Sequence, residues 1–263
     1  MAGYSDILVE PRPPAVLITL NRPQALNSIT PTMLGELAQA ITRAGQDTAV
    51  SAVIVTGAGE KAWSAGVDIK GIAGGAGESI ADRRANVAWD VLHAIEACPV
   101  PVIAAVNGFC ITGALELATA CDLVLASDRA RFADTHARWG LTATWGGTQR
   151  LPRIVGKHKA MEMMFLCDMV DAQEALRIGL VNKVVPHARL LEEALAWAGK
   201  LAEHSRHSIS SQKALIVRGL ALASGEAHAM AQRESPGQAP DAKERLESFV
   251  KGTWDKGKAL GKQ

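Results

Sequence analysis

The segment 100–126, VPVIAAVNGFCITGALELATACDLVLA, constrains the fold more than any other part of the chain. Its first seven residues are apolar, rich in β-branched side chains and too few for a typical helix, which predicts a buried strand. Asn107-Gly108 interrupts this run, and apolar residues recur at helical spacing over 113–120. A second apolar strand is expected at 123–126. The segment therefore predicts a strand, a turn, a helix and a strand.

Polar chemistry is predicted at the start of this helix. Thr112-Gly113-Ala114 are small residues, which would let a ligand approach backbone N–H groups that the helix itself does not use. Glu116 places a carboxylate among apolar neighbours in the same turn. Backbone donors beside a carboxylate suit chemistry on a carbonyl group, because the donors stabilise a developing oxyanion while the carboxylate moves protons. The alternative is a turn glycine next to a surface glutamate.

Strands and helices alternate before this segment in the same way. Strands are predicted at 15–20 and 52–56, with a helix between them that begins at Thr30 as N-cap and Pro31 as first residue. A further helix is predicted at 82–97. This alternation predicts an α/β domain whose parallel sheet is buried on both faces. The turns at Gly66 and Gly113 each follow a strand, so they are expected to converge at the carboxyl end of the sheet.

The later part of the chain has a different character. A loop-rich passage is predicted from residue 132 to 156, followed by helices at 157–166 and 172–178 and an extended piece at 181–185. Helices are then expected near 188–203, 206–223 and 241–256. We divide the chain into an α/β core, 1–200, and a helical C-terminal region, 201–263, whose apolar faces predict oligomer packing.

Composition excludes several classes of partner. The formal net charge is +1 and no long basic block occurs, so no nucleic-acid partner is expected. No apolar run approaches the roughly 20 residues of a membrane span, and no leader pattern occurs, so we expect a cytoplasmic protein. The four cysteines lack metal-binding spacing and lie among apolar residues, which favours reduced core residues and predicts no metal site.

Five segments in order resemble motifs of the crotonase superfamily, the enoyl-CoA hydratase/isomerase group, over essentially the whole chain. They are NRPQALNSIT at 21–30, WSAGVDIK at 63–70, PVIAAVNGFCITGALELATACD at 101–122, ARFADTH at 130–136 and GGTQRLPRIVG at 146–156. The resemblance implies an α/β crotonase-like fold of repeated ββα units, with C-terminal helices that assemble a homotrimer or a homohexamer. It also implies acyl-CoA thioester substrates, with coenzyme A entering as part of the substrate and no separate cofactor.

The resemblance implies roles for particular residues. The backbone N–H groups of Val67 and Gly113 match the oxyanion hole, which agrees with the chemistry proposed above for the helix start. Arg22 and Lys70 are candidate contacts for the coenzyme A phosphates, although either cation could instead be solvated. The residues that match segments lining coenzyme A are Ala25, Leu26, Ala65, Asp68, Ile69 and Lys70.

The chain departs from the family pattern at one catalytic position. Hydratases of the family use two glutamates, of which the first matches Glu116, but His136 occupies the place of the second. An imidazole can accept a proton and, with an unperturbed pKa of about 6.5, can also donate one near neutral pH. Alternatively His136 only lines the pocket, held by a neighbour such as Asp134, while Glu116 works alone. Trp145 either narrows the acyl pocket or anchors packing.

The leading hypothesis is an enoyl-CoA hydratase-like lyase that adds water reversibly to a 2-enoyl-CoA. In this hypothesis Glu116 handles the water and His136 replaces the second acid/base. Its rivals are another reaction on an acyl-CoA, namely hydrolysis, decarboxylation or isomerisation, and a thioester-binding protein with vestigial catalysis. The lack of a second carboxylate argues against a standard double-bond isomerase, and a buried carboxylate without use would be costly for a binding protein.

Overall fold

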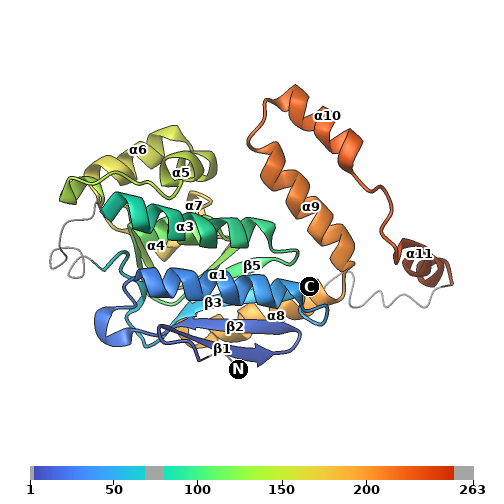
Figure 1. Cartoon of the computed structure of the whole chain (residues 1–263), viewed down its shortest axis with the longest axis horizontal. Helices are drawn as coiled ribbons and strands as arrows, with labels where there is room; N and C mark the ends of the chain where they lie inside the picture. The colour runs from blue at the N-terminus through green and yellow to red at the C-terminus, as the bar shows by residue number, and fades with distance from the viewer. Residues whose placement is uncertain (1–2, 69–79, 252–263) are drawn as a thin grey trace.

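A six-stranded sheet forms the middle of the molecule (Figure 1). The computed structural model describes residues 3–68 and 80–251, with the backbone alone for 80–86. The strands in spatial order are β1 (Ile7–Arg12), β2 (Ala15–Leu20), β3 (Ala52–Gly57), β5 (Val102–Val106), β7 (Leu123–Ser127) and β10 (Lys183–Val185). Neighbours from β2 to β10 are parallel, which confirms the predicted sheet, whereas β1 is antiparallel to β2 and was not predicted.

Helices bury both faces of this sheet, as its continuous apolar strands require. On one face, Ala52 and Ile54 of β3 belong to a cluster with Ala194 and Ala198 of α8 (Leu190–Ala202). Alternate β3 residues belong to a larger cluster on the other face, with α1 (Pro31–Gln46) and α3 (Ile80–Ala97). The start of α1 is as predicted, because the Thr30 hydroxyl accepts a hydrogen bond from the backbone N–H of Met33.

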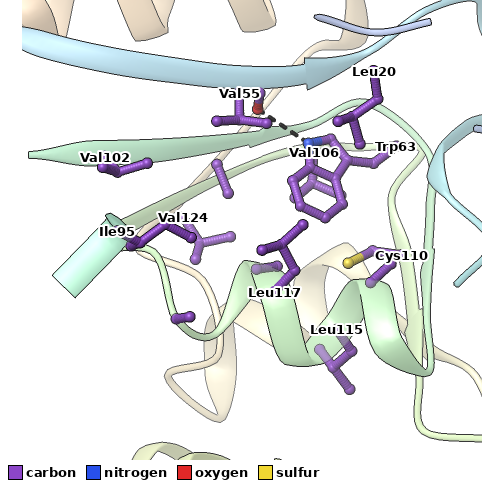
Figure 2. Packing of buried hydrophobic residues seen from close by; sticks show 14 of the residues in the cluster. Leu20, Val55, Trp63, Ile95, Val102, Val106, Cys110, Leu115, Leu117 and Val124 are labelled. Atoms are coloured by element: carbon purple, nitrogen blue, oxygen red, sulfur yellow. Dashed lines mark hydrogen bonds between the residues drawn. The ribbon is translucent and has the colours of Figure 1, made fainter. Parts of the chain in front are cut away.

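A second, four-stranded sheet contributes Trp63, Cys110 and Phe132 to the larger cluster. It contains β4 (Ala62–Ser64), β6 (Phe109–Ile111), β8 (Arg131–Ala133) and β9 (Val170–Asp171). The chain therefore runs β3–β4–α3 and then β5–β6–α4, with α4 at Gly113–Ala118, which is the repeated ββα pattern that the resemblance implied. The buried indole of Trp63 links the two sheets by donating a 3.0 Å hydrogen bond to the carbonyl oxygen of Val55 (Figure 2).

The remaining helices both confirm and correct the predictions. They are α5 (Gly147–Val155), α6 (Lys157–Leu166), α7 (Ala172–Arg177), α9 (Arg206–Gly219), α10 (Ser224–Glu234) and α11 (Ala242–Val250), with short 3-10 turns at Pro23–Ala25, Ala137–Trp139 and His187–Arg189. The prediction for α6 is confirmed, but α5 occupies a passage predicted as loop. The single helix predicted over 206–223 is wrong, because α9 ends at Gly219 and α10 begins five residues later.

The last helices extend away from the sheets, and α9 is anchored to the core at one buried charge (Figure 1). The ammonium group of Lys213 donates a 2.6 Å hydrogen bond to the carboxylate of Asp122, just before β7, and a 2.7 Å bond to the carbonyl oxygen of Ile95 in α3. Across the described ranges, no helix has both the length and the apolar character that a membrane crossing requires.

Candidate active site

The start of α4 is shaped by an unusual backbone conformation. Thr112, the residue before the helix, has φ 59° and ψ −117°, which is strained for a β-branched side chain. Its backbone N–H donates a 2.8 Å hydrogen bond to the carbonyl oxygen of Ala133, and its hydroxyl lies 2.6 Å from that of Thr135. These bonds to the β8 segment hold the turn and present the first N–H groups of α4, which the helix does not use.

The turn before α4 lies against the turn at Gly66. A parallel bridge pairs Val67 with Ile29: the N–H of Ile29 bonds the oxygen of Gly66 at 2.8 Å, and the N–H of Asp68 bonds the oxygen of Ile29 at 3.0 Å. In this arrangement the N–H of Val67 points away from the segment that carries Ile29. A methyl group added at Gly66, where φ is +86°, would lie 3.5 Å from the backbone nitrogen of Gly113.

The residues predicted to form the oxyanion hole are therefore neighbours. A methyl group built on Gly113 would lie 3.3 Å from Cγ2 of Val67, and 2.9 Å from the Trp145 ring. A side chain larger than glycine at residue 113 would collide with the indole, so the packing itself requires glycine here. Trp145 is itself buried and its ring stands beside these backbone donors, so it both packs and borders the site.

Glu116 is a buried carboxylate and not a surface residue. It is only 2% exposed, and its Oε1 atom accepts hydrogen bonds of 2.8 Å from the backbone N–H groups of both Trp145 and Gly147. Burial raises the pKa of the Glu116 carboxyl, while the Gly147 N–H and the nearby His136 oppose that rise. Gly147 begins α5, so an N–H that is unused at a helix start holds the carboxylate.

His136, at the position where the resemblance places the second carboxylate, lies beside Glu116. Its Nε2 atom lies 3.5 Å from Oε2 of Glu116, and the imidazole is 8% exposed. On the other side of the ring, Nδ1 lies 2.9 Å from Oδ1 of Asp134, and the same oxygen accepts a 3.0 Å bond from the His136 backbone N–H. The structure thus forms a row of carboxylate, imidazole and carboxylate.

The segments predicted to line coenzyme A also come together. The N–H of Ala65 donates a 3.0 Å bond to the oxygen of Leu26, and the Arg22 guanidinium lies 3.0 Å from the Asp68 carboxylate. Arg22 is therefore paired and not simply solvated, and Ala25 lies in the same 3-10 turn before Leu26. The predicted residues Ile69 and Lys70 lie outside the described residues.

Sequence reasoning missed two parts of this site. The backbone N–H of Gly147 was not identified as a support for Glu116; the Gly146-Gly147 pair before α5 was the available signal. Asn27 was also missed, although its side-chain amide is fully buried and donates hydrogen bonds of 2.9 and 2.8 Å to the oxygens of Ala58 and Ala62. Asn27 fixes the loop that carries the predicted coenzyme A contacts.

Comparisons with known proteins identify the relatives of this chain. The family model described as Enoyl-CoA hydratase/isomerase matches residues 14–253. The chain is similar to a crotonyl-CoA hydratase of Syntrophomonas wolfei, with 37% identity over 83% of this chain and 84% of that protein. It is similar to a probable enoyl-CoA hydratase of Rhizobium meliloti, with 40% identity over 94% of this chain and 96% of that protein.

A solved structure shows the same architecture. The crystal structure of an enoyl-CoA hydratase from Bacillus anthracis superposes with a TM-score of 0.89 at 33% identity, and covers 94% of this chain and 97% of that one. The family match spans the second sheet, every strand of the main sheet except β1, the Glu116 and His136 site and the described C-terminal helices. The chain therefore belongs to the enoyl-CoA hydratase/isomerase family, within the crotonase superfamily of acyl-CoA enzymes.

Proposed function

We propose that this protein catalyses the reversible addition of water to a 2-enoyl-CoA. The observation that carries the proposal is the 3.5 Å approach of His136 Nε2 to Glu116 Oε2, beside the neighbouring turns of Val67 and Gly113. A carboxylate and an imidazole supply one base and one acid, which is what addition of water needs. The names of the relatives, crotonyl-CoA hydratase and enoyl-CoA hydratase, support the same reaction.

In the proposed reaction the backbone N–H groups of Val67 and Gly113 bind the thioester oxygen. Glu116 removes a proton from water while the water oxygen bonds to C3, and the electron pair of the double bond moves onto the thioester as an enolate. The two donors stabilise that charge. Protonated His136 then gives its proton to C2, which leaves a 3-hydroxyacyl-CoA. Transfer of the proton from Glu116 to His136 restores the starting state, and their 3.5 Å separation allows this after a small movement.

The direct test is to incubate the protein with crotonyl-CoA. Loss of the enoyl absorbance with formation of 3-hydroxybutyryl-CoA supports hydration, whereas release of free thiol would mean hydrolysis. Tight binding without turnover would identify a thioester-binding protein. Glu116→Gln is the matched variant, because a glutamine oxygen can still accept from Trp145 and Gly147 but cannot serve as a base. Full activity in this variant would contradict the proposed role.

Trp145 supports a preference for short acyl groups. A methyl group built on Gly113 would lie 2.9 Å from the indole ring, so the ring is next to this residue. Because the Gly113 N–H binds the thioester oxygen in the proposed complex, the indole also lies beside the thioester carbon. A bulky side chain at this place leaves little room for a long acyl chain. Trp145→Leu should therefore improve turnover of long enoyl thioesters relative to crotonyl-CoA, and an unchanged chain-length profile would show that Trp145 serves packing alone.

Arg22 and Lys70 remain proposed contacts for the coenzyme A phosphates. Asp68 already pairs with Arg22 at 3.0 Å, so this guanidinium is held in a fixed place before any ligand arrives. A remote contact that is the same in the ground and transition states affects binding and not turnover. Arg22→Ala should therefore raise KM more than it lowers kcat, and wild-type binding should weaken with salt.

The C-terminal helices support assembly as a homotrimer or homohexamer. Large apolar side chains stand exposed on them, including Ile216 of α9, Leu220 directly after it, and Phe249 and Val250 of α11, with Val250 82% exposed. These helices also extend from the body of the molecule, so neighbouring copies could cover them (Figure 1). Apolar surface of this kind is typical of protein–protein contacts.

A further inference from the structure

Asp134 is a buried carboxylate whose bonds all serve His136. It is 2% exposed, and within the described ranges its recorded hydrogen bonds come from the His136 backbone N–H at 3.0 Å and from the imidazole Nδ1 at 2.9 Å. An ionised carboxylate in the interior is costly unless it is paired. The bond from the His136 backbone N–H is enough to hold the turn at residues 134–136. The second bond, to the imidazole, therefore calls for another explanation.

The bond to Asp134 selects the nitrogen of His136 that can exchange a proton. A carboxylate accepts hydrogen bonds, so Nδ1 carries the hydrogen and the neutral ring leaves Nε2 unprotonated. This Nε2 atom is the one that lies 3.5 Å from Glu116. When the ring takes up a second proton, that proton is placed between His136 and Glu116, at the site of the proposed chemistry.

We propose that Asp134 is a positioning residue that makes His136 the charge equivalent of the second glutamate. The proposal rests on the hydratase function above. With the ring protonated, the Asp134 and His136 pair has no net charge, as a protonated glutamate has none. With the ring neutral, the pair carries one negative charge, as an ionised glutamate does. The pair therefore reproduces both charge states of a carboxyl group, although an imidazole alone would be one charge more positive in each.

Charge equivalence has a consequence for catalysis. The charged groups recorded beside His136 in the described residues are Asp134 from its own loop and Glu116 from α4. Without the Asp134 charge, the protonated ring would be less stable and fewer molecules would hold the acid needed at C2. The enolate would also form in a more positive site, which would stabilise the enolate and slow its protonation at C2. Both effects lower turnover, and neither changes the binding of coenzyme A.

The test is a cycle of four enzymes with a pH profile for each: wild type, Asp134→Asn, His136→Glu and the double variant. Asparagine keeps an oxygen that can accept from the His136 backbone, so the turn is preserved while the charge is lost. We expect Asp134→Asn to lower kcat about 10- to 100-fold with KM changed less than about 3-fold, and to move the acidic form of the enzyme to lower pH. In the His136→Glu background the same change should cost less than about 3-fold.

Equal losses from Asp134→Asn in both backgrounds, or an unmoved pH profile, would overturn the proposal and leave Asp134 as a turn residue. A second measurement needs no variant and no activity: nitrogen-15 NMR of the wild-type histidines, at a pH where the His136 ring is neutral, should show this ring as the tautomer protonated at Nδ1. The opposite tautomer would also overturn it. If crotonyl-CoA is not hydrated while NMR shows the Nδ1 tautomer, the proposed function has failed and the placement of Asp134 stands.

Discussion

A single methyl group at Gly147 should disturb Glu116 without disturbing the fold. In Gly147→Ala the new Cβ would lie 2.9 Å from both Cγ and Oε1 of Glu116, and 3.2 Å from its Cδ. Gly147 is the first residue of α5 and its φ is not positive, so alanine meets no backbone strain there. The nearest atoms all belong to the Glu116 side chain, which means that Glu116 has to move.

The size of the effect follows from these distances. Ordinary contact with a Cβ begins at 3.4 Å, so Glu116 must withdraw by about 0.5 Å, which is the tolerance within which catalytic groups are held. This movement also lengthens the 2.8 Å bonds from Trp145 and Gly147. A misplacement of about 1 Å can cost 10²-fold, so we expect kcat to fall between about 10- and 100-fold.

The assay is hydration of crotonyl-CoA together with thermal unfolding, and the matched control is Gly199→Ala. Gly199 lies in α8 with nothing within 4 Å of a new Cβ, so alanine there should raise stability by up to about 1 kcal/mol and leave turnover unchanged. A Gly147→Ala enzyme with wild-type kcat would refute the argument that the precise position of Glu116 limits the reaction. A large loss of stability would instead show that the core cannot absorb the methyl group.

The inner strands of the main sheet could be predicted because they are largely apolar, whereas β1, which carries Glu10 and Arg12, was missed. All residues of β3 and β5 are buried, so these strands read as continuous apolar runs in the sequence. The second sheet could not be predicted in this way. Its strands have two or three residues, and β6 alternates between exposed Phe109 and buried Cys110 within a segment that otherwise has the composition of a turn.

The same reasoning explains the missed helices. The segment that forms α10 is polar around its circumference and buries Met230 alone, so it lacks the apolar face by which helices are identified. In α5, Pro152 within the helix made the passage resemble a loop.

In the site, contributions from side chains could be predicted from the sequence, whereas contributions from the backbone could not. Glu116 and His136 were found because their residue types carry the chemistry, and the resemblance placed them at matching positions. Gly147 contributes an N–H group that every residue except proline also has, so its residue type says nothing about its role. Only the fold, which brings the start of α5 onto α4, makes that N–H a support for the carboxylate.

Three further predictions concern charge and assembly. Glu116→Gln should lower kcat by at least about 10²-fold yet unfold at a higher temperature than wild type at neutral pH. Burial raises the pKa of Glu116, so the folded wild type binds more protons than the unfolded chain and loses stability as the pH rises from the ordinary to the raised pKa. The stability advantage of the variant should therefore vanish in acid. An advantage that does not depend on pH would contradict this reasoning. Light scattering should give a trimer or hexamer that Phe249→Glu weakens, whereas a stable 27.7 kDa monomer of the wild type would contradict the proposed assembly. Finally, Lys213→Met should lower the free energy of unfolding by about 3 kcal/mol, measured in urea, because it leaves the partly buried Asp122 carboxylate without its 2.6 Å partner. Burial already raises the pKa of Asp122 and Lys213 opposes that rise, so the variant should regain stability as the pH falls and the carboxyl becomes neutral. Adding Asp122→Asn should restore part of the lost unfolding free energy at neutral pH, because it removes the unpaired charge. A double variant no more stable than Lys213→Met would show that packing of the lysine side chain, and not its charge, holds α9 against the core.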